Sequence, residues 1–264
     1  MSIHPKKAYK DLDFLNSRSA RHIRILCEYE EPRQRLKEHR VHNTLVFFGS
    51  ARMQSSEEAR DVLRVAEKAA AENPSDPGAQ QVLDKARRGV ETARYYDAAR
   101  ELSHRLTAWS MARDGHPSYY ISSGGGPGIM EAANRGAYDC GGRSVGLGIS
   151  LPFEPGVNKY VTPELAFEFH YFFTRKYWFL YTCKAVVYFP GGFGTMDEMF
   201  ETLTLVQTGK IKRKLPMILF GTEYWNRILK MDEMAELGTI SSRDLDLMHR
   251  TDSVDDAFEY LVKE

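Results

Sequence analysis

The feature that most limits how this chain can fold is a pair of glycine-rich turns. The first lies at residues 122–128 and the second at residues 190–194, and each stands between a short apolar run and a segment of helical spacing. An apolar run, a glycine turn and a helix in that order predict a buried strand that leads into a helix. Two such units in one chain predict parallel strands, because a parallel pair needs a crossover connection.

The same alternation extends along most of the chain. Strands are predicted at residues 44–49, 118–122, 144–149, 165–169, 185–189 and 215–220, and helices at 129–139, 171–182, 195–208, 224–237 and 254–262, with a proline-containing loop after residue 149. This order favours an α/β fold of the Rossmann type, with a mainly parallel sheet covered by helices on both faces. We expect a single Rossmann-like domain over residues 1–264, whose main βα core is residues 114–264.

An N-terminal helical segment is predicted at residues 1–43. Its apolar residues recur at helical spacing, with Pro32 as the expected break. The surplus of Lys and Arg in this segment is interpreted as a solvated helix face. The alternative is that Arg18, Arg21 or Arg24 reaches an anionic ligand.

A helical hairpin is predicted as an insertion at residues 54–113. Residues 73–78, with the sequence NPSDPG, separate two stretches rich in Ala, Arg and Glu. Ser55 and Glu58 have the spacing of a capping box at the start of the first helix.

Composition limits the class of partner. The 36 Lys and Arg are balanced by 36 Asp and Glu, so the basic surplus of a nucleic-acid-binding protein is missing and no nucleic acid is expected. No apolar run approaches the roughly 18 residues of a membrane span, and the first residues do not resemble a signal peptide. Cys27, Cys140 and Cys183 lack the spacing of a disulfide framework or a metal site. We therefore expect a cytoplasmic protein with no metal and no membrane partner.

Both glycine turns are predicted anion sites. Glycines allow backbone N–H groups to approach a ligand, and a helix N-terminus adds unsatisfied donors and partial positive charge. Neither turn has the GK[ST] of a P-loop or the GxGxxG spacing of a dinucleotide fingerprint. A mononucleotide or a sugar phosphate is favoured over NAD, and the alternative is a pair of tight connections without a ligand.

Two further segments carry candidate chemistry. Thr195 and Glu198 have the spacing of a capping box; alternatively, Glu198 faces the ligand, ionised with help from the helix N-terminus, to stabilise an oxocarbenium-like transition state. Asp197 is the alternative candidate for this catalytic carboxylate. Arg175 and Lys176 interrupt an aromatic segment that we interpret mainly as core. One interpretation is that both side chains extend to solvent. The alternative is that Arg175, whose planar guanidinium suits phosphates and carboxylates, points into the site.

These motifs together resemble the LOG ("lonely guy") family, earlier described as lysine decarboxylase-like. They are GGGPGIMEAANRGA at residues 124–137, the Arg175–Lys176 pair, and PGGFGTMDE at residues 190–198, which completes the family's PGGxGTxxE. The resemblance covers residues 44–50 and 119–220, and the two helical additions look like the longer bacterial branch. It implies a phosphoribohydrolase that releases a free base and ribose 5-phosphate from a nucleoside 5′-monophosphate, either AMP or a cytokinin precursor, without a cofactor.

The resemblance also implies which residues form the site. Arg175 and Glu198 become the catalytic pair. The substrate-binding residues would be Gly49, Ser50, Arg52, Gly124, Gly125, Gly126, Glu131, Asn134, Lys176, Gly191, Gly192, Gly194 and Thr195. Phe172 stands where compact family members often have Met, which implies a differently shaped base pocket. A homodimer or a higher homo-oligomer is expected, with sites near the interface.

Two other functions remain open from the sequence. A nucleotide or molybdenum-cofactor carrier could use the same architecture without needing a catalytic carboxylate. A decarboxylase would ordinarily need pyridoxal phosphate on a lysine, and only the positions of Lys176 and Lys184 make them candidates.

Overall fold

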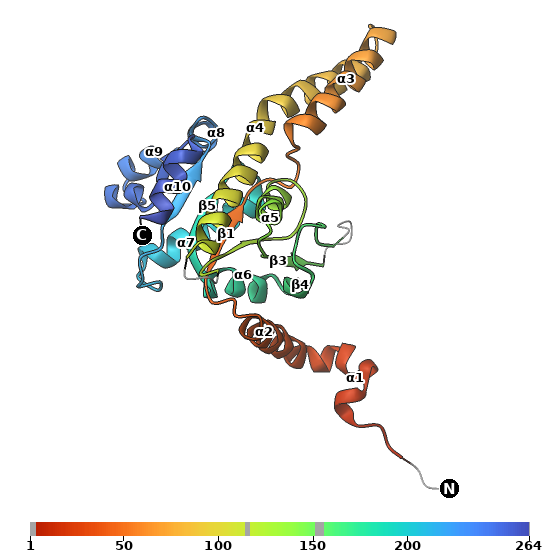
Figure 1. The fold of residues 1–264 in the computed structure, drawn as a ribbon, viewed down its shortest axis with the longest axis vertical. Helices are drawn as coiled ribbons and strands as arrows, with labels where there is room; N and C mark the ends of the chain where they lie inside the picture. Colours follow the sequence, from red (N-terminus) through yellow and green to blue (C-terminus); the bar gives the residue numbers. More distant parts are fainter. Residues whose placement is uncertain (1–3, 114–116, 151–155, 264) are drawn as a thin grey trace.

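The computed structural model describes residues 4–113, 117–150 and 156–263. At its centre lies a seven-stranded parallel sheet with the strand order β4-β3-β2-β1-β5-β6-β7 (Figure 1). The strands are β1 (Thr44–Phe48), β2 (Tyr120–Ser123), β3 (Ser144–Ile149), β4 (Ala166–Phe169), β5 (Cys183–Tyr188), β6 (Met217–Phe220) and β7 (His249–Thr251). The predicted α/β fold of the Rossmann type is confirmed.

The strand order reverses direction at β1. Leu45 is paired with Ile121 of β2 on one side and with Ala185 of β5 on the other, so the chain adds strands outward in both directions from this point. In open parallel sheets, ligands bind at such a switch point, outside the carboxyl ends of the strands. The edge strand β7 was not predicted, because three residues of sequence HRT carry no apolar run.

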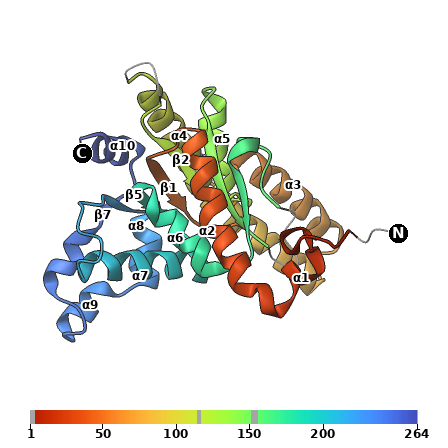
Figure 2. The same cartoon turned by 90° about the horizontal axis from the view of Figure 1, so that it is seen from below.

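Helices cover both faces of the sheet. They are α1 (Leu12–Asn16), α2 (Arg21–Glu38), α3 (Ser56–Glu72), α4 (Pro77–Met111), α5 (Ile129–Asp139), α6 (Phe172–Tyr181), α7 (Phe193–Gln207), α8 (Thr222–Ile228), α9 (Met231–Glu236) and α10 (Val254–Val262). Residues of α4, α5 and α10 form one core with the sheet, and residues of α2, α6, α7, α8 and α9 form the other (Figure 2). The single helix predicted at residues 224–237 is two helices, α8 and α9. The predicted proline-containing loop falls partly on residues 151–155, outside the described residues.

The predicted break at Pro32 is wrong, because α2 continues through this residue. A proline inside a helix cannot donate to the carbonyl four residues earlier, here that of Glu28. The indole Nε1 of Trp178 in α6 donates to this carbonyl oxygen instead, at 2.8 Å. The missing backbone donor is thereby replaced from a neighbouring helix.

The helices α3 and α4 form a hairpin that projects from the rest of the molecule (Figure 1). The predicted capping box is present: the Glu58 amide donates to Ser55 Oγ and the Ser55 amide donates to the Glu58 carboxylate. The outer part of the hairpin has its own small apolar cluster, made of Ala66, Ala70, Leu83 and Ala86. The inner part of α4 packs against α5.

The aromatic helix α6 is only partly core. Trp178 and Phe179 are buried, whereas four other aromatic residues remain exposed: Phe172, Phe173, Tyr177 and Tyr181. The interpretation of this aromatic segment as mainly core is therefore wrong for its outer half. A ten-residue helix lying on a sheet buries one stripe only, and this helix is aromatic on both sides.

Candidate active site

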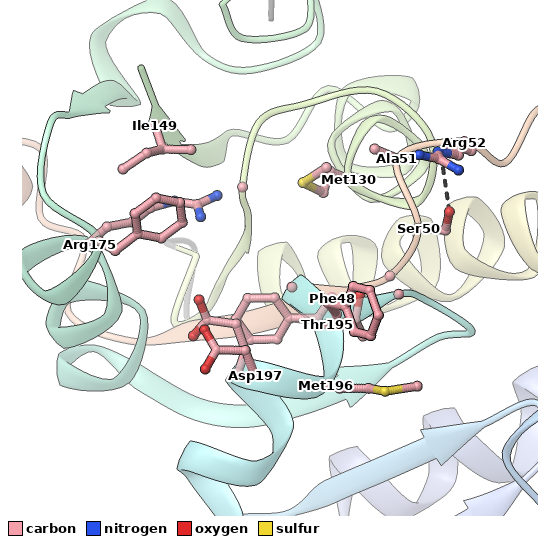
Figure 3. Close-up of a pocket in the computed structure, with 17 residues that line it drawn as sticks. Phe48, Ser50, Ala51, Arg52, Met130, Ile149, Arg175, Thr195, Met196 and Asp197 are labelled. Carbon is pink, nitrogen blue, oxygen red and sulfur yellow. Dashed lines mark hydrogen bonds between the residues drawn. The ribbon is translucent and has the colours of Figure 1, made fainter. Parts of the chain in front are cut away.

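A cavity of about 620 Å³ lies at the carboxyl edge of the sheet, next to the switch point between β1 and β5. Its lining comes from the turn after β1, the first glycine turn, the end of β3, the helix α6 and the start of α7. The lining residues are Phe48, Gly49, Ser50, Ala51, Arg52, Gly124, Met130, Ile149, Phe172, Arg175, Gly192, Phe193, Gly194, Thr195, Met196, Asp197 and Glu198. Figure 3 shows Arg175 and Arg52 on opposite sides of this space.

Backbone hydrogen bonds fix the three turns relative to one another. The amide of Ser50 donates to the carbonyl of Pro190 at 3.0 Å, and the amide of Ile129 donates to the carbonyl of Ser50 at 3.0 Å. Gly128 has a φ of 69°, and a Cβ there would clash with the backbone of Ser50 and Ala51. This glycine is therefore required where the first glycine turn crosses the turn after β1.

The N-terminus of α7 opens onto the cavity. The helix begins at Phe193, its N-cap is Gly192, and no side chain caps it. The first amides of a helix have no partner within the helix, so an anion in the cavity can accept from them. The Thr195 capping box is wrong, because the helix starts two residues earlier and Thr195 lies inside its first turn. The Thr195 side chain instead packs against Gly191, where a Cβ would collide with it.

Arg175 is held in a defined orientation at the cavity wall. Its Nε donates to the carbonyl of Leu147 at 2.6 Å, and its Cζ lies 5.0 Å from the centroid of the Phe179 ring. A Cβ on Gly124 would lie 2.5 Å from one Nη of Arg175, so the guanidinium reaches the first glycine turn. Of the two alternatives for Arg175, orientation toward the site is the observed one.

Lys176 points elsewhere. Its Nζ pairs with Asp197 at 2.8 Å and with Glu201 at 2.9 Å, both on α7. With 16% of its side chain exposed, Lys176 does not extend freely to solvent and does not line the cavity. Burial acts to lower the pKa of Lys176, but its hydrogen bonds with Asp197 and Glu201 raise the pKa above its ordinary value. The lysine is therefore kept charged as a link between α6 and α7.

Glu198 is a buried carboxylic acid with only 7% of the residue exposed. Burial raises its pKa to about 7, against the opposing effect of the positive charges of Lys176 and Arg175. The sequence-based expectation is that the helix N-terminus helps to keep Glu198 ionised. In the structure, loss of hydration favours the protonated form and outweighs the neighbouring positive charges. A carboxyl group with a pKa near 7 can act as a general acid or base near neutral pH.

Six of the predicted substrate-binding residues do not line the cavity: Gly125, Gly126, Glu131, Asn134, Lys176 and Gly191. Asn134 is fully buried and joins Ser123, Ser144 and Asn158 by hydrogen bonds, which fixes the first glycine turn from behind. Glu131 accepts a hydrogen bond from the Tyr96 hydroxyl at 2.8 Å and lines a neighbouring groove. The remaining predicted site residues lie together at the cavity.

The N-terminal arginines do not reach this cavity. Arg24 donates to the carbonyls of Leu15 and Ser17, Arg21 lies over the Tyr171 ring, and Arg18 is exposed. None of the three lines the cavity. Arg24 therefore stabilises the end of α1.

Sequence reasoning missed the apolar walls of the cavity, Phe48, Met130, Ile149 and Met196. An apolar residue at the end of a strand has the same pattern whether it faces a core or a cavity. For Met130 and Met196, only their proximity in the sequence to the glycine motifs could have indicated a place in the cavity wall.

Within residues 4–113, 117–150 and 156–263, no group of three or more His, Cys, Asp or Glu is arranged to hold a metal ion. No helix in that part of the chain is long and apolar enough to cross a membrane.

Comparison with known proteins places this site in a family. The family model described as "Possible lysine decarboxylase" matches residues 130–261, half of the 264-residue chain. A curated protein of Oryza sativa subsp. japonica, named "Probable cytokinin riboside 5'-monophosphate phosphoribohydrolase LOGL3", is 28% identical over 150 residues. That match covers 56% of this chain and 66% of the rice protein.

Two solved structures show weaker similarity. The X-ray structure of TM1055 is 19% identical, with 84% of this chain and 99% of that chain covered and a TM-score of 0.48. The molybdenum cofactor carrier protein of Chlamydomonas reinhardtii is 16% identical, with the same coverage and a TM-score of 0.44. The family model spans the helices and strands that carry Arg175, the second glycine turn and Glu198. The chain belongs to the family described as possible lysine decarboxylases, the LOG family that its glycine motifs resemble.

Proposed function

We propose that the chain is a phosphoribohydrolase that hydrolyses the N-glycosidic bond of a nucleoside 5′-monophosphate, with AMP or an N6-modified AMP as substrate. The observation that carries the proposal is the position of Glu198: a buried carboxyl group with a pKa of about 7, in the same cavity as an uncapped helix N-terminus and Arg175. The name of the rice relative supports the same reaction class.

The proposed reaction breaks the bond between the ribose C1′ and the base nitrogen. The substrate phosphate accepts from the first amides of α7, which places the ribose near Glu198. Ionised Glu198 stabilises the positive charge that develops at C1′ and takes a proton from the attacking water. The water oxygen bonds to C1′ as the bond from C1′ to the base nitrogen breaks. The departing base takes up one proton from solvent and Glu198 returns the proton of the attacking water to solvent, so the products are the free base and ribose 5-phosphate.

Arg175 has a supporting role in this proposal. Its guanidinium is anchored by Leu147 and Phe179 and lies beside Gly124, so it needs little reorganisation to bind an anionic substrate. A planar guanidinium suits phosphate and carboxylate groups, and its charge favours the ionised form of Glu198.

The decarboxylase function suggested by the family description fits the site poorly. None of the residues that line the described cavity is a lysine, so no amine there could carry pyridoxal phosphate. Lys176 is held charged by Asp197 and Glu201, whereas formation of a Schiff base needs a neutral amine. Lys184 is exposed on β5.

A panel of nucleoside 5′-monophosphates, assayed for free base by chromatography, tests the proposal. Wild type should release base from at least one, and Glu198→Gln should bind the same nucleotide without releasing base. Binding by wild type without release from any member of the panel would contradict the enzyme and favour the nucleotide carrier.

We also propose that the chain forms a homo-oligomer through the exposed aromatic surface of α6 and α7. This surface comprises Phe172, Phe173, Tyr177, Tyr181, Phe193 and Phe200, and Phe193 is 92% exposed. Large exposed apolar patches usually mark interaction sites. Light scattering after size-exclusion chromatography should give a mass of at least two chains, and Phe173→Glu with Tyr181→Glu should reduce it to one.

A further inference from the structure

A second groove, of about 770 Å³, lies between the helical hairpin and the first two strand-end turns. One side is formed by α3 and α4, and the other by the segments that begin at Ala51 and Pro127. Ala51 and Arg52 line both this groove and the candidate active site, so the two spaces share a wall. The hairpin insertion thus builds a space that the βα core alone would not enclose.

The charged side chains that line this groove are positive in sum, with three cations and two carboxylates. Arg52, Lys85 and Arg88 line it, and within the described part of the chain none of the three forms an ion pair. The two carboxylates of the groove already have donors: Glu58 is bound by Ser55, and Glu131 accepts from Tyr96. Since neutral donors orient the two carboxylates and, among the described residues, no ion pair holds the three cations, the net positive lining would attract an anion at this position.

Gly89 leaves room in the groove. It lies in the interior of α4, and a Cβ there would meet nothing within 4 Å. Glycine in a helix interior is destabilising relative to alanine, and here no packing contact requires it. Gly89 itself lines the groove, so a larger side chain there would project into the space that the cations line.

We propose that this groove binds a phosphorylated ligand of nucleotide size, with its phosphate on Lys85, Arg88 and Arg52. A volume of several hundred Å³ is typical for small-molecule sites. The ligand is either a second nucleotide or the distal part of a substrate longer than a nucleoside monophosphate. The inference rests on the proposed function in one respect: it takes the ligand of the neighbouring cavity to be a nucleoside 5′-monophosphate.

Equilibrium dialysis with AMP and with pyrophosphate tests the proposal in the Glu198→Gln background, where turnover of AMP is slowed and the total AMP is checked for released base. For at least one of the two probes, the double variant Lys85→Ala with Arg88→Ala should bind one molecule fewer per chain, or bind that molecule with an affinity at least tenfold lower. Gly89→Leu should do the same by filling the groove. Arg87→Ala, which changes the neighbouring charge outside the groove, and Gly89→Ala should bind as the parent does.

The criterion is the difference between variant and parent, so it does not depend on whether the neighbouring cavity hydrolyses AMP. Unchanged binding of both probes in the double variant would overturn the proposal even if base release by wild type supports the proposed function. A 5′-phosphorylated adenylyl dinucleotide distinguishes the two ligand sources. One dinucleotide per chain, bound at least tenfold more weakly by the double variant, indicates an extended substrate, whereas loss of an independently bound AMP indicates a second nucleotide.

Discussion

The indole N–H of Trp178 donates to the carbonyl oxygen of Glu28 across the interface between α6 and α2, at 2.8 Å. The carboxylate of the same glutamate accepts from the amides of His170 and Tyr171 and from the hydroxyl of Thr174. Glu28 therefore binds the first turn of α6 with its side chain and the middle of α6 with its backbone. Because Arg175 follows Thr174, the N-terminal helix fixes the element that carries a proposed catalytic residue.

We expect Trp178→Phe to lower the free energy of unfolding by about 1–3 kcal/mol, because it leaves the partly buried carbonyl of Glu28 without a donor. In the Pro32→Ala background the loss should be smaller, since that substitution restores a backbone amide that can donate to the same carbonyl. Urea unfolding of the two single variants and the double variant measures this coupling. Equal losses in both backgrounds would show that the indole contributes only by packing.

Substitutions of the three glycines in the second turn should have different effects, because a Cβ at each position would meet different surroundings. Gly191→Ala should destabilise the fold by about 1–3 kcal/mol, because the new methyl group collides with Thr195. Gly192→Ala and Gly194→Ala meet no atom within 4 Å and should keep the wild-type melting temperature within a few degrees. If Gly194→Ala weakens AMP binding without loss of stability, the added methyl group obstructs a ligand. Thermal melts and AMP titrations of all three variants provide the comparison.

How far the sequence predicts this structure depends on whether the signal is local. The predicted strands and both glycine turns are found, because their apolar runs and turn residues are contiguous. Helix α2 continues through Pro32 because a donor far along the chain, Trp178, replaces the lost hydrogen bond, and no local pattern contains that information. The pairing of Lys176 with Asp197 and Glu201 likewise depends on how α6 and α7 pack. The sequence leaves two orientations open for Arg175, and only the structure shows that its guanidinium lies beside Gly124.

The pKa of Glu198 predicts how stability varies with pH. Burial raises this pKa to about 7 from an ordinary value of 4.5, so the folded protein retains a proton that the unfolded chain releases between these values. The contribution of Glu198 to the free energy of unfolding is about 3 kcal/mol. It is fully present below pH 4.5 and is lost as the pH rises through 7. The difference in unfolding free energy between wild type and Glu198→Gln should therefore change across this window and be constant above about pH 8. A pH-independent difference would mean that Glu198 is ionised at an ordinary pKa.

The same pKa predicts the pH dependence of base release. If ionised Glu198 is the reactive form, kcat/KM should rise with pH to a plateau, with a midpoint near pH 7. Glu198→Gln should lower kcat by a factor of about 10²–10⁴, the usual contribution of a general base. The pH-rate profile with saturating and subsaturating AMP measures both effects. A profile that falls as the pH rises through neutrality would indicate that Glu198 acts as an acid instead.

Lys176 tests whether the electrostatic environment of Glu198 is correctly described. Its positive charge lowers the pKa of Glu198 more than that of Arg175 does, although burial dominates both. Lys176→Gln should therefore move the midpoint of the kcat/KM profile to higher pH while leaving the plateau within a few fold of wild type, because Lys176 does not line the cavity. Lys184→Gln, at an exposed position on β5, is the matched control and should leave the midpoint unchanged. A lower plateau with no shift would instead mean that Lys176 acts by positioning α7 through Asp197 and Glu201.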